Sequence, residues 1–187
     1  MTDAKPVSTP IYKSTKMVKA MSPSRKGEIL EMQEIPYQNA VGSLMYVSIE
    51  TRPDITHAVS RASQFANNPG RQHWIAVKRI LRYLKGTSSL KLRFTRSTDN
   101  SLKVFCDTDW ASDEDDRCSY TGYLFALAGA AVSWASRKQP TVALSTAEAE
   151  YRALTETSKE ALWIKESLCE LGLLYHSEIM NIKCDNK

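Results

Sequence analysis

The chain has 187 residues, and its 25 basic residues against 21 acidic ones give a formal net charge of +4. With 42% hydrophobic residues, it is long enough for one full domain and a small second unit. No apolar run approaches the roughly 18 residues of a membrane-spanning helix, and no secretory signal pattern is present. The mild basic charge is compatible with nucleic-acid binding but is also common in proteins that bind none. The four cysteines lack a C-x-x-C spacing, which indicates buried free thiols rather than a zinc site.

Residues 1–34 are rich in Ser, Thr and Lys and contain Pro6, Pro10 and Pro23. This composition predicts an extended, largely disordered basic arm. Positions 5–26 hold no acidic residue, a feature of organelle transit peptides. Such peptides favour Arg and amphipathic helices, whereas prolines interrupt this arm. We therefore expect a cytoplasmic or nuclear protein, with organelle targeting as the alternative.

Apolar residues at helical spacing predict a small unit of three helices over residues 35–87. One face of the first helix carries Ala40, Val41, Leu44, Met45 and Ser48. The second helix starts near Pro53, stops at Asn67-Asn-Pro-Gly70 and buries Ile55, Val59, Ala62 and Phe65. The third ends at Gly86 and buries Trp74, Val77, Leu81 and Leu84. His57 and His73 are interpreted as packing or surface residues rather than ligands.

Five cations lie on the other faces of the third helix: Arg71, Lys78, Arg79, Arg82 and Lys85. One interpretation is a basic ridge that faces a nucleic-acid backbone. The other is the solvated face of an amphipathic helix. The sequence leaves both open.

Residues 88–187 contain several short apolar runs that predict strands, and one segment that predicts a long helix. Val104-Phe105-Cys106 predicts a buried strand that ends on Asp107 and Asp109. Two hairpin-like strands are predicted at residues 120–125 and 131–134, and residues 90–94 are a further candidate strand. Ser145-Thr-Ala-Glu148 is a capping-box pattern that predicts a helix from Thr146 to about Gly172. Residues 179–185 repeat the pattern of an apolar strand that ends on a carboxylate, Asp185.

An acidic run, Asp113-Glu-Asp-Asp116, lies between the first two of these strands. It lacks the Asp-x-Asp-x-Asp-Gly spacing and the distal Glu of a calcium loop. We therefore expect a solvated turn there.

Phrases in this half resemble the ribonuclease H domain of copia-type retrotransposon polyproteins: Asp107-Thr-Asp-Trp-Ala, Thr121-Gly-Tyr, Val132-Ser-Trp, Leu144-Ser-Thr-Ala-Glu-Ala-Glu-Tyr151 and Cys184-Asp-Asn186. Upstream phrases are similar to the end of the reverse transcriptase in the same polyproteins: Lys5-Pro-Val-Ser-Thr-Pro10, Val41-Gly-Ser-Leu-Met-Tyr46, Thr51-Arg-Pro-Asp-Ile55 and Ala76-Val-Lys-Arg-Ile-Leu-Arg-Tyr-Leu-Lys-Gly-Thr87. The resemblance spans nearly the whole chain. It implies an α/β fold, with a mixed sheet of three antiparallel strands, one long helix and a parallel fourth strand, preceded by the helical unit. The reverse-transcriptase palm is absent from the sequence, so polymerase activity is not expected.

The resemblance also implies a site for two Mg²⁺ ions, held by four carboxylates, that cleaves phosphodiester bonds. Asp107 and Asp185 are two implied catalytic metal ligands, with Asp109 as the alternative to Asp107. Glu148 and Glu150 compete for the glutamate position because they lie about 200° apart on a helix and cannot face one site. Glu150 is preferred, because Glu148 occupies the third position of the capping box.

In the family, the fourth ligand and a final helix come after the position of Lys187. We therefore expect weak binding of the second metal and a partly open sheet face that invites a protein partner. Two functions are therefore considered. In the first, the chain is a host-adopted relic of a retrotransposon that is catalytically weak or inactive and binds a protein or nucleic acid. The second is an active Mg²⁺-dependent ribonuclease H that cleaves RNA in RNA–DNA hybrids. Met1 in front of a phrase that is interior in the family, together with the early end, favours the relic.

Overall fold

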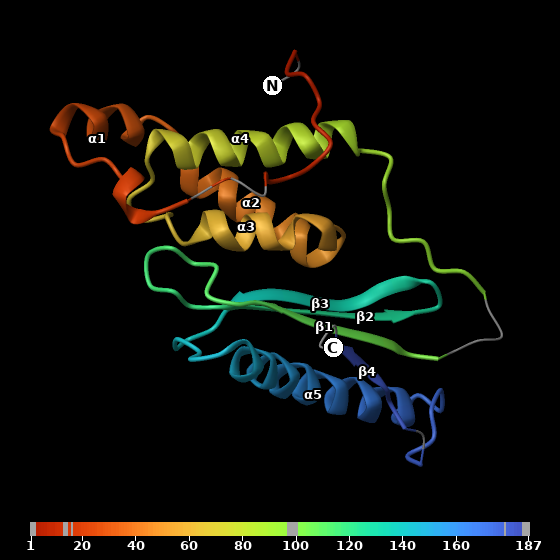
Figure 1. Ribbon diagram of the computed structural model, residues 1–187. Coiled ribbons are helices and arrows are strands. Elements are labelled where there is room, and N and C mark those ends of the chain that lie inside the picture. Colours follow the sequence, from red (N-terminus) through yellow and green to blue (C-terminus); the bar gives the residue numbers. More distant parts are fainter. Residues whose placement is uncertain (1–2, 13–14, 16, 97–100, 178, 185–187) are drawn as a thin grey trace. The chain divides into compact units, whose positions relative to one another are not determined.

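All four described strands lie in the second half of the chain together with one long helix, and the other helices lie in the first half (Figure 1). The computed structural model describes residues 3–12, 15, 17–96, 101–177 and 179–184. Contacts divide the chain into a first unit, Met1–Lys91, and a second unit, Leu92–Lys187. Among the described residues, no helix combines the length and the apolar character needed to cross a membrane.

The first unit consists of four α-helices and two short 3-10 turns. These are η1 (Lys19–Met21), α1 (Lys26–Gln33), α2 (Tyr37–Glu50), η2 (Pro53–Ile55), α3 (Thr56–Ser63) and α4 (Arg71–Gly86). The three predicted helices are therefore present as α2, α3 and α4. Helix α1 was not predicted, and it lies within the residues interpreted as an arm. Because only Met32 of α1 is buried, the helix has no apolar periodicity from which to recognise it.

The core of the first unit joins α2, α3 and α4. It contains Tyr37, Val41, Leu44, Ile55, Ala58, Val59, Ala62, Val77, Ile80 and Tyr83. Trp74, Leu81 and Leu84 are half-buried against it, as their spacing predicted. The assignment of Met45 to the buried face was wrong, since its side chain is 43% exposed. Position 45 directly follows the core residue Leu44, so a turn of about 100° per residue carries it toward the edge of the buried stripe.

A charged cluster ties the start of η2 to the end of α4. The Arg52 guanidinium donates to both carboxylate oxygens of Asp54, at 2.9 and 2.7 Å, and to the Thr87 carbonyl oxygen at 3.2 Å. The Tyr83 hydroxyl donates to Asp54 at 2.7 Å. Hydrogen bonds from Arg52 hold the pKa of Asp54 below its usual value, although partial burial acts in the opposite direction. This cluster gives Thr51-Arg-Pro-Asp a structural function.

The N-terminal residues lie against α4. Arg82 Nε donates to the Lys5 carbonyl oxygen at 2.7 Å, and Lys85 Nζ donates to that of Ala4 at 3.0 Å. A Cβ added to Gly86 would stand 2.9 Å from the Cβ of Pro6. The absence of a side chain at Gly86 therefore lets the arm pack closely against the end of the helix. Helix α4 ends at Gly86 as predicted, but Gly86 has no positive φ, and its role is this close approach.

The second unit is a four-stranded sheet with one long helix. The strands are β1 (Lys103–Asp109), β2 (Tyr120–Leu127), β3 (Ala130–Lys138) and β4 (Ile182–Cys184), in the order β3-β2-β1-β4. β1, β2 and β3 pair antiparallel, and β4 pairs with β1 in parallel. Helix α5 (Thr146–Glu170) connects β3 to the β4 edge. The expected mixed sheet is confirmed.

Two expected strand features differ in the structure. Residues 90–94 form no strand, although the next residue, Thr95, donates its backbone N–H to the Ala128 carbonyl oxygen at 2.8 Å. The last strand is confined to Ile182–Cys184, because only Ile182, Lys183 and Cys184 pair with β1. An apolar run predicts where a strand can form, whereas pairing with a neighbour decides its length.

The two faces of the sheet are covered differently. Helix α5 runs along one face (Figure 1), where Val104 and Phe125 pack against Ala161, Ile164 and Leu168. On the opposite face, Phe105 is 42% exposed and Val132 is 40% exposed. α5 ends at Glu170, and Gly172 shortly after it has φ +69°. The Leu173 N–H donates to the Leu168 carbonyl oxygen at 2.9 Å, which confirms the predicted glycine stop.

Candidate functional site

Asp107 lies on the sheet face that α5 does not cover. Along β1, burial alternates, so Val104 and Cys106 face the helix while Phe105 and Asp107 face away from it. Cys106 is fixed on the helix side by Thr157, whose hydroxyl lies 3.1 Å from the Cys106 sulfur. Asp107 pairs across the sheet with Gly122, which has no side chain to cover it. Asp107 is therefore exposed on an inner strand of the sheet, near the end of that strand.

Glu148 is held by the start of α5. Ser145 Oγ accepts the Glu148 backbone N–H at 3.1 Å, which is one half of the predicted capping box. In a capping box the Glu148 carboxylate would accept the backbone N–H of Ser145. Here it accepts that of Leu144 instead, at 2.7 Å, and it also forms an ion pair with Arg152 at 2.5 Å. The hydrogen bond from Leu144, followed by the contact with Arg152, lowers the pKa of Glu148. This carboxylate is thus engaged in the local structure.

Glu150 is half-buried and accepts no hydrogen bond from the described part of the chain. Its neighbour Ala149 is fully buried against the sheet, and the Ala149 carbonyl oxygen accepts Gln139 Nε2 at 2.9 Å. The same Gln139 nitrogen lies 3.0 Å from Thr121 Oγ1. Thr121 directly precedes Gly122, the register partner of Asp107. These bonds place the first turn of α5 at the same end of the sheet as Asp107.

The last implied ligand follows β4. Cys184, the final residue of β4, is in register with Cys106 in the parallel pair, and each cysteine is followed in sequence by an aspartate. Asp185 itself lies outside the described residues. Among the residues that are described, no three His, Cys, Asp or Glu side chains gather closely enough to hold a metal ion.

The carboxylates of Asp107 and Asp109 also form no hydrogen bond or ion pair within the described residues. Unpartnered carboxylate oxygens are the ligands that Mg²⁺ prefers, so Asp107, Asp109 and Glu150 fit such an ion chemically, whereas Glu148 is occupied. An open cavity of about 530 Å³ adjoins Asp107 and is also lined by Phe105, Gly122 and Lys183. The Lys183 ammonium lies 5.7 Å from the Phe105 ring centroid. A cation therefore stands on the face that carries the Asp107 carboxylate.

The acidic run between β1 and β2 is more than a solvated turn. Asp113 is buried, and its carboxylate accepts Lys138 Nζ at 2.6 Å and the Asp115 N–H at 3.0 Å. Asp116 pairs with the same lysine at 2.8 Å. The expectation of a solvated turn was wrong for Asp113, because a cation at the end of β3 compensates its burial. Lys138 is 25 residues away in sequence, so the run alone gave no sign of it.

The five cations of α4 divide into two groups. Arg82 and Lys85 donate to arm carbonyls as described above, and Arg79 Nη2 donates to Thr9 Oγ1 at 2.8 Å. Arg71 is exposed and Lys78 is half-buried. Part of the predicted basic ridge is thus occupied by the chain's own N-terminal residues.

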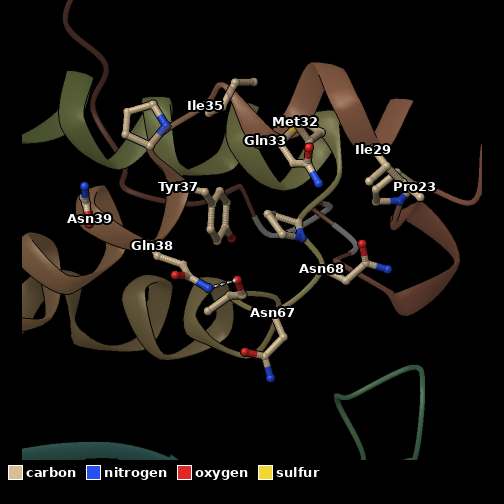
Figure 2. Close-up of a pocket in the computed structure, with 13 residues that line it drawn as sticks. Pro23, Ile29, Met32, Gln33, Ile35, Tyr37, Gln38, Asn39, Asn67 and Asn68 are labelled. Carbon is tan, nitrogen blue, oxygen red and sulfur yellow. Dashed lines mark hydrogen bonds between the residues drawn. The ribbon is translucent and has the colours of Figure 1, made fainter. Parts of the chain in front are cut away.

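A separate cavity of about 380 Å³ lies in the first unit and is lined mainly by uncharged polar side chains and prolines (Figure 2). Gln38 Nε2 donates to the Ala66 carbonyl oxygen at 3.0 Å on its wall, and Tyr37 lies beside it. Its lining contains no carboxylate, cysteine or histidine. It is therefore not a candidate for the metal site.

Comparison with known proteins found transposon polyproteins that match along the whole of this chain. The chain is 52% identical over 187 residues to the "Retrovirus-related Pol polyprotein from transposon TNT 1-94" of Nicotiana tabacum. It is 42% identical over 187 residues to the "Retrovirus-related Pol polyprotein from transposon RE2" of Arabidopsis thaliana. The chain spans 14% and 12% of the length of these polyproteins.

A third match covers most of a shorter protein. The chain is 50% identical over 133 residues to the "Secreted RxLR effector protein 161" of Plasmopara viticola, which is 71% of this chain and 94% of that protein. No family model and no solved structure matches the chain. The matches to the polyproteins include the strand that carries Asp107 and the helix that carries Glu150. The chain therefore belongs to the family of retrovirus-related Pol polyproteins from copia-type transposons.

Proposed function

We propose that the second unit is a Mg²⁺-dependent ribonuclease H unit that acts on RNA–DNA hybrids. The proposed metal ligands are Asp107, Glu150 and Asp185. The observation that carries the proposal is the contrast between paired and idle carboxylates. Glu148 and Asp113 are bonded to donors of the fold, whereas Asp107 and Glu150, near one end of the sheet, have no partner among the described residues. A carboxylate that stabilises nothing in the protein is available to a metal ion.

The chain's own residues would position this site in three ways. Asp107 stands near the end of β1, where α5 does not cover it, and the Gln139–Ala149 hydrogen bond fixes the first turn of α5 at the same end of the sheet. Parallel pairing of Cys184 with Cys106 brings the end of β4 next to β1. Asp107, Glu150 and Asp185 would hold Mg²⁺, which would supply charge stabilisation for the displacement at a phosphodiester.

The first unit would contribute to substrate binding through α4. Arg71 and Lys78 are the α4 cations for which no bond to the arm is described, and we assign them to contacts with the nucleic-acid backbone. Contacts of this kind position a duplex without reading its sequence. Magnesium use and hybrid binding are both parts of this proposal.

The test is cleavage of a labelled RNA–DNA hybrid by the 187-residue chain in Mg²⁺ or Mn²⁺. We expect Asp107→Asn and Glu150→Gln each to lower the cleavage rate at least about 100-fold, because loss of metal-based charge stabilisation costs several kcal/mol. Glu148→Gln is the matched control, since it removes the same charge two residues away and should retain the rate. Equal rates for wild type and Asp107→Asn would overturn the assignment.

The second candidate is a protein that binds hybrids without cutting them. It is favoured by the absence of a three-ligand cluster among the described residues. Fluorescence anisotropy with the same hybrid separates the two functions. Binding by a folded chain that shows no cleavage at any Mg²⁺ or Mn²⁺ concentration supports the second candidate, whereas cleavage abolished by both substitutions excludes it.

A further inference from the structure

Arg79 is the most buried cation of α4. Its side chain faces the N-terminal arm and is only 8% exposed. The guanidinium carbon lies 3.2 Å from the ring centroid of Tyr12, and Nη2 donates to the Thr9 hydroxyl at 2.8 Å. The arm thus encloses the charged end of Arg79 with an aromatic ring and a neutral hydroxyl.

The charge of Arg79 is not neutralised within the described part of the chain. No carboxylate there forms an ion pair with it, and its buried Nε has no hydrogen-bond partner. A buried charge ordinarily has a counter-charge and satisfied donors, because its desolvation is otherwise costly. Arg52 in the same unit follows that rule through Asp54. Arg79 therefore lacks the anion that its burial calls for.

The surroundings of Arg79 would suit such an anion. A cavity of about 700 Å³ lies between the arm and α4, and Arg79 lines it together with Lys78, Arg82 and Gln72. No acidic side chain is among its lining residues. Three cations around one cavity provide more positive charge than a single carboxylate neutralises, and guanidinium groups match the spacing of phosphate oxygens.

We propose that this cavity is a phosphate-binding site in which Arg79 is the central ligand and Tyr12 holds its guanidinium in place. The phosphate is one of the nucleic-acid backbone, and this choice of source rests on the proposed function. Since Arg79 lines the cavity, the phosphate would meet the guanidinium from that side. The N-terminal arm then forms one side of the binding site.

The first experiment measures the thermal unfolding of the full chain with inorganic phosphate, against chloride at equal ionic strength. We expect phosphate to raise the Tm of the wild type and of Lys26→Gln, and not that of Arg79→Gln. Lys26 is an exposed α1 cation outside the cavity lining, so its substitution matches the charge change. The same rise of Tm in Arg79→Gln would overturn the site.

The second experiment identifies the source of the phosphate. Anisotropy with an RNA–DNA hybrid should show about tenfold weaker binding for Arg79→Gln, and a slope of log K against log salt that is smaller by about 0.9. Unchanged hybrid affinity with a lost phosphate response would overturn the backbone as the source and leave free phosphate. A wild type that binds no hybrid but responds to phosphate through Arg79 would refute the proposed function and support the site.

Arg79→Lys keeps the experiment decisive if Arg79→Gln fails to fold. Lysine retains the charge and much of the stem but lacks the planar fork that binds two oxygens at once. We expect a folded protein, by circular dichroism, with a phosphate-induced rise of Tm smaller than that of the wild type. A rise equal to that of the wild type would exclude Arg79 as a fork-type ligand.

Discussion

One pair of ionisable residues from each unit shows the two ways in which this chain uses charge. In the first unit, Arg52 and Asp54 bind each other and Tyr83, so the charges hold η2 to the end of α4. In the second unit, Asp107 and Glu150 bind nothing in the described chain. Charges that stabilise a fold are recognised by their partners, whereas charges reserved for a ligand are recognised by the lack of them. By this criterion Asp107 belongs to a site, and Asp54 belongs to the structure.

The units differ equally in packing. Three helices enclose the core of the first unit, whereas in the second unit α5 covers only one face of the sheet, and Phe105 and Val132 on the other face stay exposed. Substitutions at matched positions sharpen this comparison.

The largest effect is expected for the aromatic residues of the sheet. Phe125 is fully buried beneath α5, so Phe125→Ala should lower the free energy of unfolding by about 4 kcal/mol. Phe105→Ala, on the neighbouring strand and the open face, should cost only about 1 kcal/mol, mostly from the contact with Lys183. Hydrogen exchange of α5 amides reports both. Equal losses would mean that the second face is as well packed as the first.

A smaller effect is expected for two glycines of the first unit. A Cβ at Gly70 would stand 1.9 Å from the Met21 carbonyl oxygen, so Gly70→Ala must separate η1 from α4 and should cost about 3 kcal/mol. Gly42 in α2 has no atom within 4 Å of such a Cβ, and Gly42→Ala should stabilise the helix by about 0.5–1 kcal/mol. Thermal unfolding checks the opposite signs, and a loss of stability from Gly42→Ala would contradict the open environment.

The smallest of the three effects depends on pH. Asp54→Asn should lower the stability of the first unit by about 2 kcal/mol at pH 7, the usual contribution of hydrogen bonds to a charged group. Because hydrogen bonds from Arg52 lower the pKa of Asp54 in the folded state, its stabilisation is complete above its unfolded pKa of about 3.9. The stabilisation is lost as the pH falls through the lower folded pKa. Urea unfolding should therefore distinguish the variant from the wild type at pH 7, and the difference should shrink as the pH falls below about 3.9. A difference that persisted in acid would exclude the charge as the cause.

Much of the fold was predictable because the relevant signals are local. Apolar periodicity located α2, α3 and α4, and the pattern around Ser145 located the start of α5. Helix geometry showed that Glu148 and Glu150 cannot face one site, the capping-box position of Glu148 favoured Glu150, and this preference stays a prediction. The burial of Asp113 escaped prediction because its partner Lys138 is distant in sequence. Helix α1 escaped because it buries a single side chain.

The sequence by itself determined the order of the elements and the position of Asp107 near the end of a strand, since alternation and helical periodicity are properties of neighbouring residues. Tertiary structure decided which charges have partners: Asp113 with Lys138, Asp54 with Arg52 and Tyr83, and Arg79 with a hydroxyl and a ring instead of a carboxylate. Those pairings join residues that lie 2 to 70 positions apart. They depend on how elements pack, so only the folded chain distinguishes a structural charge from one that awaits a ligand.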